Sequence, residues 1–337
     1  MSKLAVSCVL LTISVSVAMA ADPQRDTARQ RLIEKLKERR QSSASTAAAA
    51  GSETLKHAGK DRTYRLHRPK NITSGQPVPL VIVLHGFGAD GGMTEALSGL
   101  NAVADKHGFA VVYPDGLGRM WRFWENLDGR IAPGSPDDVG FIEALIDHLV
   151  STKVADSQRV YVTGISNGGF MSNRLGCSLS DKIAAIAPVA GSMPKLMSDK
   201  INAPRAMPVM TFHGTDDRIV KPNGADFFSK TELSLSATEL AAWWAKSNGC
   251  SAKPVTEAMP DTADDGTRVT RHSYRNAQNE TLVIHYEITG GGHTWPGGAF
   301  QPEILLGKTT KDINASELMW EFFHKHALPA KPQRDTK

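Results

Sequence analysis

Three groups of residues in this 337-residue sequence could together form a nucleophilic catalytic site. The first is the segment Gly164-Ile165-Ser166-Asn167-Gly168, in which a serine stands between two glycines. The second holds Asp216 and Asp217, and the third holds His293 within a glycine-rich stretch. A serine hydroxyl becomes a good nucleophile when a histidine accepts its proton and a carboxylate orients that histidine. The residue types therefore predict acyl transfer through a covalent intermediate.

The sequence around Ser166 predicts a sharp turn between a strand and a helix. The apolar run 159–163 precedes the motif, and the amphipathic stretch 169–179 follows it. The pattern G-x-S-x-G in this context is typical of a nucleophile elbow, where glycines leave room for a serine in a strained backbone conformation. The turn also brings Ser166 to a helix N-terminus, where main-chain amides stabilise negative charge.

The acid and the histidine follow the serine in the chain order that this type of site requires. Asp216 and Asp217 come directly after the apolar run 209–212, and either could orient the histidine. His293 comes after the last apolar run, 282–286. The remaining histidines in linkers, strands and helices are expected to be structural or exposed; they are His57, His67, His107, His148, His272 and His285.

The segment Leu84-His85-Gly86-Phe87-Gly88 ends the first clear core strand and predicts a loop beside the serine. In this arrangement the loop supplies one amide of an oxyanion hole, and the residue after the nucleophile supplies the other. The expected donors are the backbone N–H groups of Phe87 and Asn167. Each such donor contributes about 3 kcal/mol to stabilising the transition state.

Aromatic residues near these motifs are candidate substrate contacts. Trp121, Phe123, Trp124 and Trp295 lie in predicted loops that could border a cleft. We consider Trp121, Trp124 and Trp295 as residues that hold an aromatic acyl group or an aliphatic chain. Packing beneath the loops is the alternative, because large aromatic rings are also common core residues.

The elements that must carry these motifs alternate between strands and helices. Apolar runs that predict buried parallel strands lie at 80–84, 109–113, 159–163, 184–189, 209–212 and 282–286. Stretches that predict helices lie at 94–106, 139–150, 169–179, 237–246 and 315–326. The alternation predicts an α/β protein with a mostly parallel central sheet and helices on both faces. Together with it, the serine elbow and the chain order of serine, acid and histidine are typical of the α/β-hydrolase fold. The carboxyl ends of such strands meet at one edge, where a catalytic site is expected.

The N-terminal residues predict export. Lys3 precedes an apolar stretch from Leu4 to Val17, and Ala18-Met19-Ala20 has the small-residue pattern that signal peptidase cleaves. Residues 1–20 are therefore expected to be a signal peptide, and the protein is expected to be secreted or periplasmic. The apolar stretch is short for a spanning helix, so no stable membrane insertion is expected after cleavage, and a retained anchor is the alternative.

The rest of the chain divides by composition. Residues 21–52 predict a basic helical leader followed by an Ala/Ser-rich linker. The catalytic domain is expected at 53–328, and a polar tail is expected at 329–337.

Charge, motifs and cysteines narrow the classes of function. Residues 1–60 carry 10 Lys and Arg against 5 Asp and Glu, whereas residues 61–337 carry 29 against 30. This near-neutral balance argues against nucleic acid as a partner. Neither a metal-binding nor a nucleotide-binding motif is present, so no metal and no cofactor is expected. Cys177 and Cys250 would remain after export and could form a disulfide or stay as buried thiols.

Taken together, these motifs resemble those of the extracellular polyhydroxybutyrate depolymerase and feruloyl esterase family, over roughly residues 55–326. The matching segments are Val83–Gly86, Tyr113–Gly116 with Trp121, Asp137–Phe141, Gly164–Gly169, Phe212–Asp217 and Gly292–Gly297. The resemblance implies an α/β-hydrolase fold and a serine esterase activity. It also implies that Asp217 is the acid, because Asp217 is the fourth residue of the G-x-x-D pattern.

The resemblance implies esters of polyhydroxybutyrate or other polyhydroxyalkanoates as the first candidate substrates. Feruloyl or acetylxylan esters of plant polysaccharide are the alternative, as is an acyltransferase reaction that shares the acyl-enzyme step. Many relatives pair the cysteine equivalent to Cys250 with another near Ser273, and this chain has none there. Polymer-degrading relatives often carry a substrate-binding domain, and this chain ends soon after its last predicted helix. Soluble or oligomeric esters are therefore expected.

Overall fold

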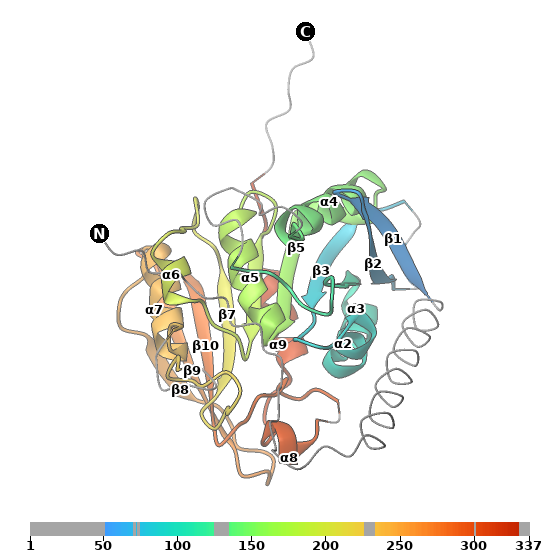
Figure 1. Cartoon of the computed structure of the whole chain (residues 1–337). Helices are drawn as coiled ribbons and strands as arrows, with labels where there is room; N and C mark the ends of the chain where they lie inside the picture. The colour runs from blue at the N-terminus through green and yellow to red at the C-terminus, as the bar shows by residue number, and fades with distance from the viewer. Residues whose placement is uncertain are drawn as a thin grey trace, which may run out of the picture. The chain divides into compact units, whose positions relative to one another are not determined.

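One mixed sheet organises the described part of the chain (Figure 1). The computed structural model describes residues 51–69, 72, 75–124, 135–225, 233–299 and 301–329. The predicted signal peptide and residues 21–50 of the predicted leader lie outside these ranges, as does the predicted tail beyond residue 329, whereas Ser52, expected to end the leader, begins the first strand. No helix within these ranges is long and apolar enough to cross a membrane.

The sheet has ten strands in the order β1-β2-β4-β3-β5-β6-β7-β10-β9-β8. Their bounds are β1 Ser52–His57, β2 Lys60–His67, β3 Val78–Leu84, β4 Ala110–Pro114, β5 Ala155–Ile165, β6 Ala185–Val189, β7 Val209–Gly214, β8 Val255–Ala258, β9 Arg268–Arg275 and β10 Thr281–Thr289. The six central strands, from β4 to β10 in this order, pair in parallel. The outer strands pair antiparallel at both edges. The prediction of a mostly parallel central sheet is confirmed.

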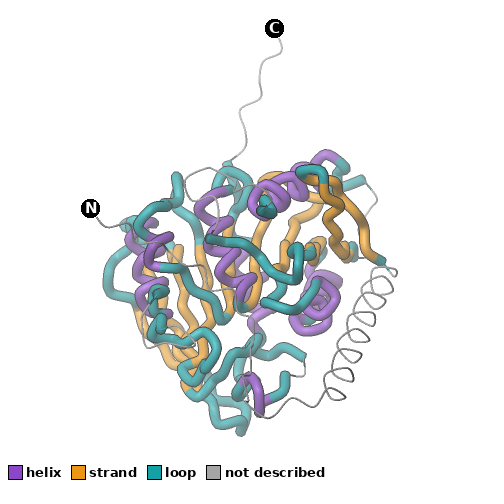
Figure 2. Tube along the Cα trace, in the orientation of Figure 1, coloured by secondary structure: helices purple, strands orange, loops and turns teal. Residues whose placement is uncertain are grey.

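The central strands form because their side chains are apolar on both faces of the sheet. In β3, Leu80, Ile82 and Leu84 pack into one core, whereas Val81 and Val83 pack into the other. Helices α4, α5 and α7 cover the first face and lie in front of the sheet in Figure 1. Helices α3 and α9 supply residues to the second core, and Figure 2 shows the helices around the sheet.

The described helices are α2 Gly91–Ser98, α3 Leu100–His107, α4 Asp138–Ser151, α5 Asn167–Ser178, α6 Lys195–Ser198, α7 Ala237–Ser247, α8 Glu303–Leu306 and α9 Ala315–Phe323. Four of them, α2, α4, α7 and α9, begin after a residue whose side chain accepts from a free backbone N–H group. The Asp137 carboxylate accepts from Gly140 N at the start of α4. Ser236 and Glu239 form a capping box at the start of α7.

The structure corrects several predicted elements. The single helix expected at 94–106 is two helices, because Gly99 adopts φ 64° and breaks the hydrogen-bond ladder. The last helix ends at Phe323 and does not reach residue 326. The four antiparallel strands were not predicted, because polar residues interrupt them: β2 reads KDRTYRLH, and every residue of β8 is exposed.

The two cysteines within the described ranges are both free thiols. Cys177 is buried on α5, and burial raises the pKa of its thiol to about 12. Cys250 is partly buried, and burial raises its pKa as well. The alternative of a disulfide between Cys177 and Cys250 is therefore not realised in this structure.

A row of polar side chains crosses the sheet from β7 to β8. Thr211 Oγ1 lies 2.8 Å from His285 Nδ1, and Thr256 Oγ1 lies 3.1 Å from His272 Nδ1. His285 is 2% exposed, and burial lowers its pKa to about 3, helped by the nearby histidines His213 and His272. The His285 imidazole is therefore neutral in the folded protein at any pH above about 4.

We predict that acidification from pH 7 to pH 5 weakens the fold in part through His285. The unfolded chain binds a proton at this residue below pH ~6.5, while the folded chain does not until about pH 3. Stability is therefore lost as the pH falls below 6.5, by about 2 kcal/mol at pH 5. Urea unfolding at both pH values should show a smaller loss for His285→Gln than for the wild type.

His324→Gln is the matched control, because this histidine is exposed at the end of α9. Its pH dependence should equal that of the wild type. An unchanged pH dependence in His285→Gln would contradict the assignment of acid sensitivity to the buried imidazole.

Candidate active site

Ser166 occupies a strained turn between β5 and α5. Its backbone has φ 58° and ψ −120°, in a region that residues with a side chain rarely adopt. Ser166 N donates to Val189 O at 2.9 Å, and Phe170 N donates to Ser166 O at 3.0 Å. These two bonds tie the turn to the end of β6 and to the first turn of α5. The Ser166 side chain is left partly exposed at the carboxyl edge of the sheet.

Gly168 makes this turn possible. A Cβ atom at Gly168 would collide with the carbonyl oxygen of Leu84, the last residue of β3. At Gly164 a Cβ would lie 2.7 Å from the same oxygen. Both glycines are therefore required by the close approach of the elbow to β3.

Asp217 is the carboxylate that contacts His293. His293 Nδ1 lies 2.7 Å from Asp217 Oδ2, and Asp217 is 3% exposed. The other oxygen, Oδ1, accepts from Ile219 N at 2.8 Å and from Val220 N at 2.9 Å. Asp216 is exposed, and among the described residues its side chain accepts a hydrogen bond only from Thr215 Oγ1, at 3.2 Å. In a neutral imidazole this contact places the proton on Nδ1, which donates to Asp217, and Nε2 is then the atom that can accept a proton.

A second histidine, His213, lies near the same oxygen of Asp217. His213 Nε2 donates to Val220 O at 2.7 Å and lies 3.6 Å from Asp217 Oδ2. Burial lowers the pKa of His213, so the ring is neutral near pH 7. From the sequence, His213 was only part of the motif around the acid, although its position directly after the apolar run 209–212 indicates a buried contact.

The backbone of the His293 loop is fixed by the residues around α8. His293 N donates to Leu306 O at 2.6 Å, and Gly292 N donates to Lys308 O at 2.9 Å. These backbone bonds fix the His293 loop at the end of β10 and place α8 next to this loop.

The backbone N–H groups of Phe87 and Asn167 are unpaired within the described residues. Asn167 is the first residue of α5, so its amide has no partner inside the helix. Phe87 follows Gly86, where a Cβ would lie 3.5 Å from the Cβ of Ser166. The loop with one expected oxyanion donor therefore lies directly beside Ser166.

The parallel register brings Ser166, Asp217 and His293 to one edge of the sheet. They follow β5, β7 and β10, and β6 pairs with β5 while β7 pairs with both β6 and β10. In the described part of the chain the Ser166 hydroxyl makes no hydrogen bond, so its contact with His293 stays a prediction.

The three candidate tryptophans differ in their placement. Trp121 and Trp295 are fully buried, and their indole N–H groups donate to His85 O at 3.1 Å and to Ser316 Oγ at 3.0 Å. Their rings therefore offer no free surface to a substrate, and packing beneath the loops describes them better. Trp124 is 41% exposed and remains available.

Trp124 belongs to a group of aromatic rings near Ser166 that includes Phe123, expected from the sequence to border a cleft, and Phe170, which was not expected there. Phe123 stacks on Phe170, one turn after Ser166, with ring centroids 4.8 Å apart. Trp124 packs edge-on against Phe123 at 4.7 Å. Phe87, which was considered only for its backbone amide, has a side chain that is 72% exposed. The chain order gave no signal for the pairing of Phe123 with Phe170.

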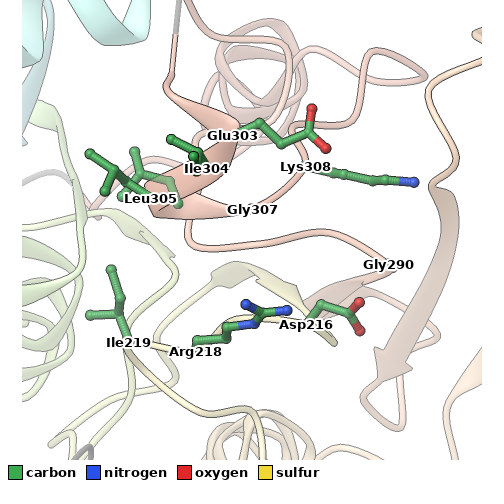
Figure 3. A pocket seen from close by; sticks show the side chains of 10 residues that line it. Asp216, Arg218, Ile219, Gly290, Glu303, Ile304, Leu305, Gly307 and Lys308 are labelled. Atoms are coloured by element: carbon green, nitrogen blue, oxygen red, sulfur yellow. The ribbon is translucent and has the colours of Figure 1, made fainter.

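A cavity of about 470 Å³ lies between the acid loop and α8 (Figure 3). One side is apolar, formed by Ile219, Ile304 and Leu305. The other side carries charged side chains of both signs, namely Asp216, Arg218, Glu303 and Lys308. Elsewhere in the described ranges, as here, His, Cys, Asp and Glu side chains form no group of three or more that could hold a metal ion.

Comparison with known proteins agrees with this architecture. The family model described as "Esterase PHB depolymerase" matches residues 63–233, which contain Ser166 and Asp217. The chain belongs to this esterase family. It is therefore a carboxylic ester hydrolase with an α/β-hydrolase fold, and both predictions are confirmed.

Relatives of this esterase carry several ester-hydrolase names. NocK of Nocardia uniformis subsp. tsuyamanensis, whose name describes it as an esterase, is 31% identical over 79% of this chain and 80% of its own length. Feruloyl esterase B of Piromyces equi is 31% identical over 77% of this chain, which spans only 44% of that protein. Poly(3-hydroxyalkanoate) depolymerase C of Paucimonas lemoignei is 26% identical, over 67% of this chain and 58% of its own length.

A solved structure shows the same fold. The acetyl xylan esterase of Aspergillus awamori superposes with a TM-score of 0.57 at 18% sequence identity. The match covers 82% of this chain and 99% of that one.

We predict that Asp217→Asn lowers kcat far more than Asp216→Asn. Of the two aspartates, Asp217 is the one that contacts His293. An asparagine amide at position 217 would favour the tautomer of His293 with its proton on Nε2, which cannot accept the serine proton. The expected loss is on the order of 10⁴-fold for Asp217→Asn and less than about 3-fold for Asp216→Asn, as judged from other triads. Turnover of a soluble p-nitrophenyl ester measures both. A larger loss in the Asp216 variant would reverse the assignment.

Proposed function

We propose that this esterase is an exported serine hydrolase that acts through Ser166, His293 and Asp217. The observation that carries the proposal is the buried 2.7 Å contact between His293 Nδ1 and Asp217, at the sheet edge where the strained Ser166 turn lies. A base oriented by a carboxylate beside a serine elbow supports acyl transfer.

In the first half-reaction, His293 Nε2 takes the proton from Ser166 Oγ as this oxygen attacks the ester carbonyl carbon. The carbonyl oxygen becomes an oxyanion and accepts hydrogen bonds from the N–H groups of Phe87 and Asn167. The C–O bond to the alcohol then breaks, and His293 returns the proton to the leaving alcohol. The acyl group remains on Ser166.

In the second half-reaction, water replaces the alcohol. His293 takes a proton from water, the hydroxide oxygen attacks the acyl carbon, and the Ser166 ester bond breaks with return of the proton to Oγ. The products are the carboxylic acid and the free enzyme. An added alcohol in place of water would give transesterification, so product analysis with an alcohol separates hydrolase from acyltransferase.

The proposed substrates are polyhydroxybutyrate or other polyhydroxyalkanoate oligoesters. Ile304 and Leu305 of α8 are 95% and 73% exposed, and backbone bonds connect α8 to the His293 loop. With Ile219 they form an aliphatic wall suited to a chain of short hydroxyalkanoate units. A relative named poly(3-hydroxyalkanoate) depolymerase supports this class.

The second candidate is a feruloyl ester. The stacked Phe123 and Phe170 with Trp124 offer ring faces near Ser166 that suit a planar aromatic acyl group. The relative named feruloyl esterase supports it. An acetylxylan ester is the third candidate substrate. Its acetyl group is too small to depend on contacts with the aliphatic wall or with the aromatic rings.

The proposed location is outside the cytoplasm. It rests on the predicted signal peptide at residues 1–20, which lies outside the described residues. Processing after Ala20, read by N-terminal sequencing of the mature protein, tests it.

We predict that Ser166→Ala abolishes ester hydrolysis and labelling by a fluorophosphonate probe. The hydroxyl is the proposed nucleophile, so its loss removes the covalent step and should lower kcat by on the order of 10⁵-fold or more. Intact-mass analysis of the labelled protein locates the adduct. Ser178→Ala is the control, because this serine is exposed on the same helix. Residual turnover near the wild-type rate in a folded Ser166→Ala protein would refute the proposed nucleophile.

We predict that substrate preference separates the aliphatic wall from the aromatic rings. Hydroxybutyrate oligomers, methyl ferulate, acetylated xylan and p-nitrophenyl acetate form the panel. Leu305→Ser should lower kcat/KM about 10-fold for hydroxybutyrate oligomers and leave p-nitrophenyl acetate unchanged, because an apolar side chain contributes 1–3 kcal/mol to binding. Phe123→Ala should act in the same way on methyl ferulate. Preference for methyl ferulate in the wild type would favour the second candidate.

A further inference from the structure

A short segment, Gly116–Arg122, contacts both parts of the chain that carry the proposed oxyanion donors. At its C-terminal end Trp121 N donates to Asn167 Oδ1 at 2.6 Å. In return, Asn167 Nδ2 donates to Trp121 O at 3.0 Å. The Asn167 side chain is therefore held at both of its polar atoms by one residue of this segment. The backbone N–H of Asn167 is also one of the two proposed oxyanion donors.

The indole of Trp121 reaches the other donor loop. It is fully buried, and its Nε1–H donates to His85 O at 3.1 Å. The indole also packs against the His85 ring, with centroids 5.0 Å apart. His85 Nε2 accepts from Gly116 N at 2.9 Å, so the proton lies on Nδ1, which donates to Gly86 O at 2.8 Å. Trp121 and Gly116 thereby fix the loop that leads to Phe87.

Arg119 adds a third connection, from the solvent side. Gly88 N donates to Arg119 O at 2.8 Å, and Arg119 Nη1 donates to Gly88 O at 3.3 Å. Arg119 Nη2 pairs with Asp90 Oδ2 at 3.0 Å. The segment therefore holds the loop on both sides of Phe87.

The segment is anchored in turn to a buried ion pair. Asp138 Oδ2 accepts from Arg122 N at 2.9 Å, and Asp138 Oδ1 accepts from Arg62 Nη2 at 2.7 Å. Both side chains of the pair are buried, and the guanidinium lies 3.8 Å above the Phe141 ring. Breaking such a buried pair is costly, because loss of either partner would leave an unpaired buried charge.

From these contacts we infer that Gly116–Arg122 is a bracket that sets the separation of the Phe87 and Asn167 amides. Within it, Trp121 is a positioning residue for the oxyanion hole. This inference rests on the proposed function, because it assumes that these two amides stabilise the oxyanion formed after attack by Ser166.

The bracket matters for the transition state more than for substrate binding. An oxyanion donor is effective when its nitrogen lies 2.7–3.1 Å from the oxygen that becomes charged. Binding of the neutral ester carbonyl in the ground state depends far less on that distance. A shift of one donor by a fraction of an ångström should therefore lower kcat and leave KM nearly unchanged.

The test compares two buried tryptophans in the full-length protein. Trp121→Phe removes the indole hydrogen bond to His85 O and keeps an aromatic ring. Trp244→Phe is the matched control, because Trp244 is also fully buried and donates from Nε1 to Asn173 Oδ1 at 2.9 Å. With p-nitrophenyl butyrate, Trp121→Phe should lower kcat about 10- to 100-fold with KM within about 2-fold of wild type. Trp244→Phe should keep the wild-type kcat even if its melting temperature falls as much as that of Trp121→Phe.

A transition-state mimic provides a second readout. An arylboronic acid forms a tetrahedral adduct with a reactive serine, and one of its oxygens occupies the oxyanion hole. Its inhibition constant should rise in Trp121→Phe by the same factor by which kcat/KM falls, and it should not change in Trp244→Phe. A purely structural effect of Trp121 would not produce this proportionality.

Asn167→Ala tests the other end of the bracket and does not depend on the folding of the tryptophan variant. It keeps the backbone N–H and removes both side-chain bonds to Trp121, so it should also lower kcat about 10-fold or more. The losses of kcat in Trp121→Phe and Asn167→Ala should combine less than additively. The two variants remove different hydrogen bonds, but all of these bonds belong to the same connection between the Asn167 and Phe87 amides, which runs through Trp121.

Failure of this inference differs from failure of the proposed function. If Ser166→Ala is inactive while both Trp121→Phe and Asn167→Ala keep the wild-type kcat, the bracket is refuted and the nucleophile stands. Equal losses of kcat in Trp121→Phe and Trp244→Phe would refute it as well. If Ser166→Ala stays active, the proposed function itself is wrong.

Discussion

The close approach of the elbow to the end of β3 is the contact on which the site depends. Gly168 lies so near the Leu84 carbonyl that no side chain fits between them. This contact puts the loop after β3 beside Ser166 and lets α5 begin with its free amides at the same place. A protein interior is close-packed, so one additional methyl group here would have to move β3 or α5. The strained φ of Ser166 is maintained by this packing and by the bond from Ser166 N to Val189 O.

The two buried carboxylates around the site, Asp217 and Asp138, each have both oxygens paired by hydrogen bonds. A buried carboxylate is costly unless its oxygens are satisfied. Asp217 has two backbone amides and one imidazole as donors, and Asp138 has an arginine and a backbone amide. The two carboxylates lie after different strands, and each fixes one functional part: the base for Asp217 and the segment with Trp121 for Asp138. The same physical device is therefore used twice, once with an imidazole as partner and once with a guanidinium.

Much of this architecture was predictable because the central strands are continuous apolar runs. The strands expected at 80–84 and 209–212 lie within β3 and β7. Polar strands such as β2 and β8 have no such signal, since their stability comes from pairing with neighbours distant in the sequence. The choice between Asp216 and Asp217 needed the resemblance, because both residues follow the same strand. The burial of Trp121 against His85 could not be predicted, as it depends on how loops from different strands meet.

The order of the strands has a consequence for when activity can arise. Asp217 and His293 are 76 residues apart in the sequence, and His293 follows β10, which pairs with β7. During synthesis at ~5–20 residues per second, the segment with Ser166 leaves the ribosome on the order of ten seconds before His293 does. Until β10 joins β7, the serine has no base and cannot turn over an ester. On the proposed triad, a nascent or partly translocated chain is therefore silent, and hydrolysis begins only after the sheet has closed on its last parallel strand.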